Sequence, residues 1–214
     1  MLIVRKAQYQ NFLKYCDLNR WSSYWYQIKE ILFLKPESVL EIGVGDRTTS
    51  SYLKNNTSVD YKSVDISEEL KPDIVCDVTN LSSVIKPKSF DVVCAFEVLE
   101  HLPFEKFKTN LQELGRASKK NVIISLPHWG RHFSIEFRLP YFKKWSWTFK
   151  LNFFSIPHVF DGHHYWEIGK SNYSLSTVKS EINKAGFDIL KDYIVFESPY
   201  HHFFILQKKI FNLL

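Results

Sequence analysis

Apolar residues follow two different periods along the first part of the chain. From Tyr9 to Leu34 they recur every three or four residues, which predicts a helix that ends at Lys35-Pro36. Short apolar runs bounded by turns predict buried strands. These runs are Ser38 to Ile42, Tyr61 to Ile66, Asp73 to Val78, Phe90 to Phe96 and Asn121 to Leu126.

Helical signals separate these runs. Thr48 to Leu53 is expected to form a helix with Thr48 or Asp46 as its cap, and Pro103 is placed well as the first residue of another. Near the C-terminus, Ser176 to Ala185 predicts a helix capped by Gly186. Two final strands are expected after it, at Phe187 to Phe196 and His202 to Gln207. The alternation predicts a doubly wound α/β fold with a mostly parallel sheet, which binds ligands at the carboxyl ends of its strands.

Residues 128–172 break this pattern, because aromatic residues become dense and the periodicity is poor. We therefore expect an irregular, aromatic-rich segment there. From Pro127 to His158, five basic residues face only Glu136 as an acidic counterpart: Arg131, Arg138, Lys143, Lys144 and Lys150. This bias accounts for part of the net charge of +5. A solvated surface, an anionic substrate, an anionic membrane or nucleic acid would each explain it.

The remaining composition is that of an ordinary globular protein. Hydrophobic residues make up 45% of the 214 residues, so one domain with a sizeable core is expected. Cys16, Cys76 and Cys94 are far apart and lack metal-ligand spacing, which indicates free thiols in a reducing compartment. The start of the chain lacks the apolar length of a signal peptide, and no run is long enough to span a membrane. We therefore expect a cytoplasmic protein.

The turn Glu41-Ile42-Gly43-Val44-Gly45 is the first candidate for chemistry. Gly43 and Gly45 allow the backbone to approach a ligand where a side chain would block it. Asp65 ends the second strand about twenty residues later, where a carboxylate can take both ribose hydroxyls. Asp77 ends the third strand, where it can accept a hydrogen bond from an adenine amino group. Each feature alone has a structural explanation, but their order and position at strand ends favour a nucleoside-containing ligand.

These residues resemble the class I S-adenosylmethionine-dependent methyltransferases, of the type 11 and type 23 kinds. The resemblance covers residues 38–126, includes Phe96-Glu97-Val98-Leu99-Glu100-His101-Leu102, and continues more loosely around Gly186. It implies a Rossmann-like sheet of seven strands with an antiparallel last strand, and S-adenosylmethionine as the cofactor. The implied cofactor-binding residues are Glu41, Gly43, Gly45, Asp65, Ile66, Asp77, Val78, Phe96 and Glu97. Arg47 departs from the family, which often has a third glycine there, and this departure disfavours a dinucleotide more than S-adenosylmethionine.

The resemblance also implies an organisation of the chain around the cofactor. Residues 1–36 are expected to form a helical segment that covers the cofactor site, and residues 37–127 the cofactor-binding α/β core. Residues 128–172 form an aromatic-rich lid inserted after the fifth strand, where it overhangs the methyl group. Residues 173–214 add a helix and a strand pair that complete the core.

The lid holds the candidate catalytic residues. His163 and His128 could act as a general base, since histidine titrates near neutral pH. His163 and Glu167 are four residues apart and could meet on one helical turn, as an oriented base or as two metal ligands. A packed or capping histidine is the competing interpretation, and we expect no bound metal. Methyl transfer can also proceed by in-line approach without a dedicated base.

Three functions remain open from the sequence. The leading hypothesis is methyl transfer to oxygen or nitrogen of a small-molecule or glycan-type acceptor. The alternatives are a non-catalytic protein that binds S-adenosylmethionine, and a methyltransferase for a macromolecular or membrane-associated acceptor. No nucleic-acid module is visible, so the sequence argues against nucleic acid and leaves room for peripheral membrane contact. It defines neither the acceptor nor the oligomeric state.

Overall fold

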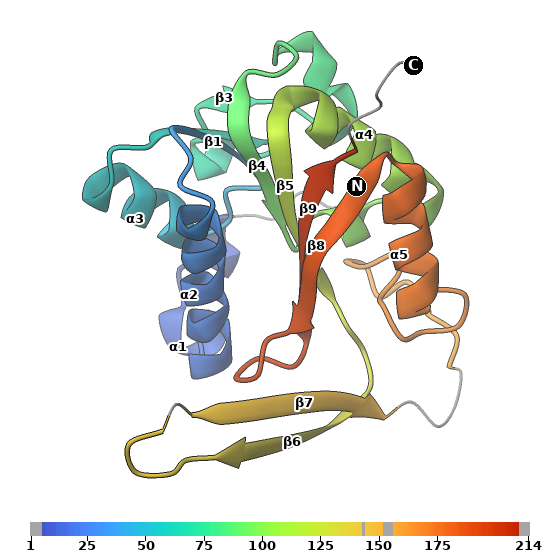
Figure 1. Ribbon diagram of the computed structural model, residues 1–214. Helices are drawn as coiled ribbons and strands as arrows, with labels where there is room; N and C mark the ends of the chain where they lie inside the picture. The colour runs from blue at the N-terminus through green and yellow to red at the C-terminus, as the bar shows by residue number, and fades with distance from the viewer. Residues whose placement is uncertain (1–5, 143, 152–155, 210–214) are drawn as a thin grey trace.

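A seven-stranded sheet forms the centre of the protein in the computed structural model, which describes residues 6–142, 144–151 and 156–209 (Figure 1). Its strand order is β3-β2-β1-β4-β5-β9-β8. Neighbours from β3 to β5 pair in parallel, and β9 is antiparallel to both β5 and β8. The strands are β1 (Ser38–Ile42), β2 (Asp60–Asp65), β3 (Ile74–Val75), β4 (Phe90–Phe96), β5 (Ser118–Pro127), β8 (Phe187–Ile194) and β9 (His201–Lys208). The predicted fold class, including the antiparallel last strand, is confirmed.

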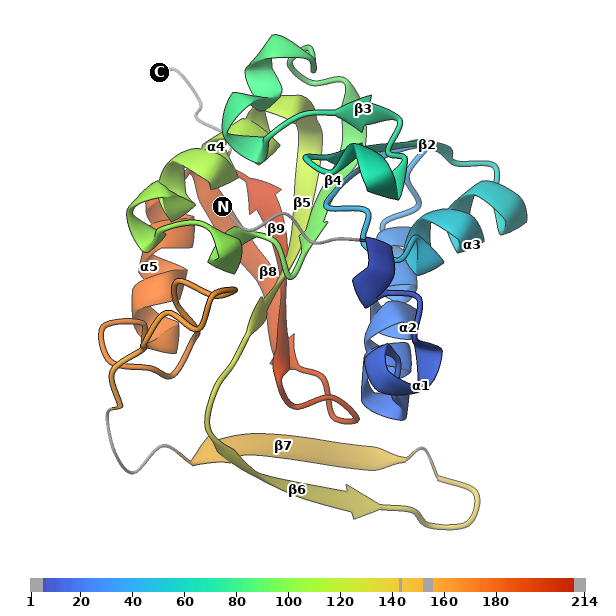
Figure 2. The ribbon, with the colours of Figure 1, turned by 180° about the vertical axis from the view of Figure 1, so that it is seen from behind.

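Helices cover both faces of this sheet (Figure 2). One layer holds α2 (Leu18–Phe33) and α3 (Thr48–Asn56), and the other holds α4 (Phe107–Ala117) and α5 (Leu175–Lys184). Neighbouring residues of β1 serve the two layers, since Val39 packs with Ile31 and Leu53 whereas Leu40 packs with α4 and α5. Strands buried on both faces read as continuous apolar runs, which is why their positions were predictable.

The N-terminal region differs from the single helix predicted from Tyr9 to Leu34. It consists of α1 (Phe12–Tyr15) followed by α2, with Cys16 in an extended conformation between them. Asp17 begins α2, because its Oδ1 accepts a hydrogen bond from the backbone N–H of Arg20 at 2.8 Å. A carboxylate that caps a helix start competes with a continuous helix through the same position.

Two other elements are shorter than the sequence predicts. β3 ends at Val75, because the Asp77 side chain accepts from the Thr79 backbone N–H and starts a 3-10 helix at Val78. Pro103 precedes a 3-10 turn over Phe104–Lys106, and α4 begins only at Phe107. Both corrections come from local side-chain or proline geometry at an element boundary, where periodicity carries little information.

The segment expected to be irregular contains a regular hairpin. β6 (Arg131–Phe137) and β7 (Trp145–Leu151) pair antiparallel and lie beside the main domain rather than in its sheet (Figure 1). The period of two was present in Phe133, Ile135 and Phe137, but aromatic density obscured it. Lys143, Phe153 and Phe154, which contributed to the predicted basic and aromatic character, lie outside the described residues.

The thiols and the helices add two findings. Cys16, Cys76 and Cys94 are all free, as predicted from their spacing. Among the described residues, no helix combines the length and apolar character needed to cross a bilayer.

Candidate functional site

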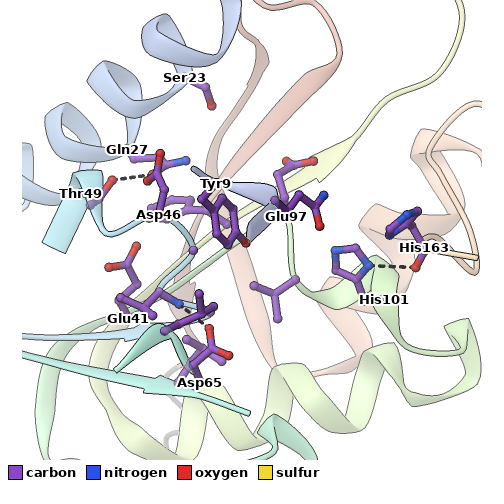
Figure 3. Close-up of a pocket in the computed structure, with 18 of the residues that line it drawn as sticks. Tyr9, Ser23, Gln27, Glu41, Asp46, Thr49, Asp65, Glu97, His101 and His163 are labelled. Carbon is purple, nitrogen blue, oxygen red and sulfur yellow. Dashed lines mark hydrogen bonds between the residues drawn. The ribbon is translucent and has the colours of Figure 1, made fainter. Parts of the chain in front are cut away.

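A cavity of about 420 Å³ opens at the carboxyl ends of β1, β2 and β4 (Figure 3). The loop after β1 forms its floor, and the loops after β2 and β4 form two of its walls. The N-terminal segment closes one side with Tyr9, Tyr15, Arg20, Ser23, Tyr24 and Gln27. The opposite side comes from Asp161, His163, His164, Tyr200 and His201. Eight of the nine predicted cofactor residues line this cavity: Glu41, Gly43, Gly45, Asp65, Ile66, Val78, Phe96 and Glu97.

The loop after β1 depends on glycine. Gly43 and Gly45 both have positive φ angles, of +80° and +53°. A Cβ atom on Gly43 would lie 2.4 Å from Cγ2 of Val98, whereas one on Gly45 would meet only the Tyr9 hydroxyl at 4.0 Å. Gly43 is therefore fixed by both conformation and space, and its bare backbone faces the cavity.

Arg47 shows why a third glycine is common at its position. Its φ is +70°, the left-handed conformation, directly before the first residue of α3. Asp46 assists this turn, since its Oδ1 accepts from the Thr48 N–H at 3.0 Å. Arg47 adopts a backbone conformation that favours glycine. The arginine therefore adds local strain to the loop but does not change its geometry.

The Asp65 carboxylate ties the loop after β1 to the loop after β2. Its Oδ2 accepts from the Val44 N–H at 2.9 Å and its Oδ1 from the Ser67 N–H at 2.8 Å. Burial raises the pKa of Asp65, and these backbone donors oppose that shift. Asp65 thus sits at the cavity edge on a rigid loop pair. The sequence suggested a ligand-binding or a structural role for Asp65, but it did not indicate that the carboxylate joins these two loops.

Glu41 lies beneath the glycine loop and is buried. The hydroxyl of Tyr61 donates a hydrogen bond to its carboxyl group. Burial raises the pKa of Glu41 to about 8, and the neighbouring carboxylates of Asp46 and Asp65 add to the shift. A cationic ligand group near this end of the cavity would favour the ionised form of Glu41.

Asp77 is the predicted cofactor residue that does not line the cavity. Its Oδ1 accepts from both the backbone N–H and the hydroxyl of Thr79, at 2.8 Å each. Oδ1 therefore serves as the cap of the 3-10 helix that begins at Val78. Its neighbour Val78 and the partly buried Cys76 line the cavity in its place.

The N-terminal segment supplies residues that sequence reasoning did not single out. The Tyr24 hydroxyl donates to Asp46 Oδ2 at 2.7 Å, and Thr49 donates to Gln27 Oε1 at 2.6 Å. These bonds hold α2 against the loop after β1 and the start of α3. Tyr24 and Gln27 are polar residues on the inward face of a helix, and that pattern was the available signal.

The three predicted catalytic residues do not come together. His163 lines the cavity, but residues 161–167 form no helix, so it does not pair with Glu167 as the four-residue spacing predicted. Glu167 instead accepts from His164 Nδ1 at 2.9 Å and from the Tyr200 hydroxyl at 2.5 Å. His128 does not line the cavity.

His128 belongs to a buried relay behind the cavity. Its Nδ1 lies 2.9 Å from Nδ1 of His202, whose Nε2 donates to Asp192 at 3.0 Å. Since His202 uses its Nε2 proton for Asp192, a neutral His202 ring accepts at Nδ1 and His128 donates. Burial lowers the pKa of His128 to about 3, with help from His202 and Lys150. A ring that remains neutral and hydrogen-bonded in this way has a packing role.

A second group of ionisable side chains stands at the side of the cavity near β4. Glu100 is fully buried, with His101 Nε2 at 4.0 Å and His164 Nε2 at 3.9 Å from its Oε1. Burial raises the pKa of Glu100 to about 7, and the nearby His164 opposes the shift. Burial, followed by repulsion from Glu100, also raises the pKa of Glu97.

Comparison with known proteins places this geometry in context. A family model described as a methyltransferase domain matches residues 18–192. No curated protein matches the chain in sequence. Magnesium protoporphyrin IX methyltransferase from Synechocystis PCC 6803, solved with bound SAM, is 14% identical with a TM-score of 0.60, over 95% of this chain and 90% of that one.

Two further solved structures share the fold. 1,6-Didemethyltoxoflavin-N1-methyltransferase from Burkholderia thailandensis is 12% identical with a TM-score of 0.58, over 88% of this chain and 80% of that one. A SAM-dependent methyltransferase from Archaeoglobus fulgidus is 16% identical with a TM-score of 0.59, over 94% of this chain and 99% of that one. At these identities the structural likeness concerns the fold alone.

Proposed function

The chain belongs to the class I S-adenosylmethionine-dependent methyltransferases, and from this premise we propose that it methylates an oxygen or nitrogen atom of a small-molecule or glycan-type acceptor. The observation that carries the proposal is the cavity at the carboxyl ends of β1, β2 and β4, with bare glycine backbone on its floor. Two of the solved structures described above are, by name, methyltransferases for 1,6-didemethyltoxoflavin and magnesium protoporphyrin IX. Both acceptors are small planar molecules, which suits a cavity with aromatic walls.

The donor occupies the half of the cavity nearest β1 and β2 in this proposal. Gly43 and Gly45 pass beneath S-adenosylmethionine, Asp65 faces the ribose, and Ile66 and Val78 frame the adenine. Glu41 stabilises the cationic methionine end through the loop above it. Asp77 is not assigned to the donor in this proposal, because it does not line the cavity and its Oδ1 caps a 3-10 helix.

The acceptor occupies the opposite half, between the 161–164 segment and Tyr200. Among the described residues, Gln8 to Gln27 then close over the donor, and Asp161 to His164 close over the acceptor. His163 borders this half and could accept the acceptor's proton. With the methyl group and the acceptor atom held in line, positioning and desolvation supply much of the rate.

A methyl-transfer assay tests this function. Purified protein is incubated with S-adenosylmethionine labelled in its methyl group and a panel of hydroxyl- and amine-bearing planar molecules and glycosides, and labelled product is measured. Product formation that disappears in Gly43→Val is the expected result. Donor binding without product across the whole panel would favour the non-catalytic alternative and overturn the proposal.

The hairpin favours a second candidate, in which the acceptor lies at an anionic lipid surface. Opposite residues of an antiparallel pair share a face, so one face carries Phe133, Ile135, Phe137, Trp145, Trp147, Phe149 and Leu151. Trp145 is 60% exposed and Trp147 is 49% exposed. The other face is polar, with Ser134 hydrogen-bonded to Thr148.

Charge complementarity selects a lipid surface over a second copy of the chain. The sequence of the hairpin has one carboxylate, Glu136, which pairs with Lys144 at 2.8 Å and with Arg138 at 3.6 Å, and the rim also carries Arg131. The positively charged rims of two copies would repel each other, whereas an anionic lipid surface would attract the rim of each copy.

Vesicle flotation tests this second candidate. Binding to phosphatidylglycerol vesicles that weakens with salt, fails with phosphatidylcholine and disappears in Trp147→Glu is expected. Lys86→Glu, a charge change distant from the hairpin, serves as the control. A dimer in light scattering that Trp147→Glu dissociates would instead assign the face to a second copy.

A further inference from the structure

Glu100 is a buried carboxylate without a donor. Its side chain is completely buried at the end of β4, and among the described residues no side chain donates a hydrogen bond to either of its oxygens. A buried carboxylate without hydrogen bonds or a cation is costly. The Nε2 atoms of His101 and His164 lie 4.0 and 3.9 Å from its Oε1. These distances are too long for hydrogen bonds.

Both histidines are held with Nε2 directed toward Glu100. The Nδ1 of His101 lies 2.9 Å from the His163 carbonyl oxygen, so it donates its proton there (Figure 3). The Nδ1 of His164 donates to the Glu167 carboxylate at 2.9 Å, and Tyr200 also donates to that carboxylate. In a neutral ring a protonated Nδ1 leaves a lone pair on Nε2. In their neutral forms, these two rings therefore direct two lone pairs toward the Glu100 carboxyl group.

We propose that Glu100, His101 and His164 bind a divalent transition-metal ion such as Zn²⁺. One ligand atom from each residue lies within 4.8 Å of the others. Zn–N and Zn–O bonds of about 2.0–2.2 Å need ligand atoms slightly closer together than this, which small side-chain rotations supply. An outer carbonyl or carboxylate that accepts from Nδ1 is the usual support for a metal-bound histidine, and both histidines have one.

The position of this site gives the ion a role in the proposed methyl transfer. His101 and His164 line the cavity, so the open coordination positions face the acceptor half. An acceptor hydroxyl that binds there would lose its proton to water at a lower pH, because the ion lowers the pKa of a bound oxygen. The S–CH₃ bond then breaks as the O–CH₃ bond forms, and S-adenosylhomocysteine leaves as a neutral thioether. This role, which rests on the proposed function, selects hydroxyl-bearing acceptors.

Calorimetric titration with Zn²⁺, and the visible absorption of Co²⁺, test the site in protein that carries neither donor nor acceptor. One ion per chain is expected. Glu100→Gln and His164→Gln should each weaken binding by at least about 100-fold, since loss of an outer partner alone costs about 10–100-fold. Glu100→Gln is isosteric and His164 is partly exposed, and circular dichroism checks that both variants fold.

Asp161→Asn is the matched control, because Asp161, His164 and Glu167 form the other set of groups that could hold an ion. Because Asp161 is not a ligand in the proposed site, the affinity of Asp161→Asn for Zn²⁺ should remain within about 3-fold of wild type. Absence of binding at millimolar Zn²⁺, or binding lost in Asp161→Asn and kept in Glu100→Gln, would overturn the proposal. S-adenosylmethionine binding measured in the same variants separates this outcome from a failure of the proposed function.

Discussion

Substitution of Gly43 by alanine separates two physical demands on the loop after β1. The added Cβ would lie 2.4 Å from Cγ2 of Val98 at a φ of +80°. A left-handed conformation costs an alanine about 1–2 kcal/mol, and overpacking against a fixed neighbour adds roughly 1–3 kcal/mol. We therefore expect Gly43→Ala to lower the free energy of unfolding by about 2–5 kcal/mol, with a fall in Tm of roughly 4–20 °C for a chain of this size.

Gly45→Ala provides the matched comparison. Its φ is also positive, at +53°, but its nearest neighbour would be the Tyr9 hydroxyl at 4.0 Å. Only the cost of the left-handed conformation remains, so the free energy of unfolding should fall by about 1–2 kcal/mol. The added methyl group faces the cavity, so this variant should still weaken donor binding.

The assays are urea denaturation for stability and calorimetry for S-adenosylmethionine affinity. In the double variant Gly43→Ala/Val98→Ala the clash is removed, and a favourable coupling of about 1–2 kcal/mol is expected between these neighbours. Equal losses in Gly43→Ala and Gly45→Ala, or strict additivity with Val98→Ala, would refute the reasoning.

Three further predictions concern the rest of the fold. Gly115→Ala should destabilise by about 1–3 kcal/mol in urea although alanine favours helices, because the new Cβ would lie 2.6 Å from the Phe187 ring; a gain in stability would contradict the packing. Arg47→Gly should stabilise by about 0.5–1 kcal/mol by relieving the left-handed residue at φ +70°, whereas Arg47→Ala should give no gain in the same titration. The pKa of His128 is lowered to about 3, so between that value and an unfolded pKa of about 6.5 the unfolded chain binds more protons than the folded chain. Its stabilising contribution is therefore complete above about pH 6.5 and decreases as the pH falls toward 3. Burial also lowers the pKa of His201 to about 3, so both proteins lose stability as the pH falls. Between pH 7 and pH 5 wild type should lose about 2 kcal/mol more than His128→Gln; equal losses in the two proteins would contradict the relay with His202.

Sequence reasoning located the floor of the cavity because its signals are local. Gly43 and Gly45 follow an apolar run directly, and Asp65 follows the next one, so strand ends and ligand contacts coincide. Asp77 follows its strand in the same way as Asp65, but its Oδ1 caps the 3-10 helix that begins at Val78. Such short-range hydrogen bonds compete with a ligand for the same carboxylate.

The far wall of the cavity could not be predicted in the same way. His164 approaches Glu100 from a segment more than sixty residues later in the chain, and only the tertiary fold brings them within 3.9 Å. The expected pair of His163 and Glu167 assumed a helix, but Asp161 Oδ1 instead accepts from two successive backbone N–H groups and forms a turn. A spacing of four residues has meaning only after the local conformation is known.

Calorimetric titration of S-adenosylmethionine into wild-type protein and Asp65→Ala tests the central claim most directly. Asp65 lines the cavity and holds Val44 and Ser67 through its two oxygens. One donor molecule per chain should bind to wild type, and Asp65→Ala should reduce the affinity by at least about 10-fold, the equivalent of one charged hydrogen bond. Absence of binding to folded wild-type protein, or equal affinity in the variant, would contradict the assignment of this cavity to the methyl donor.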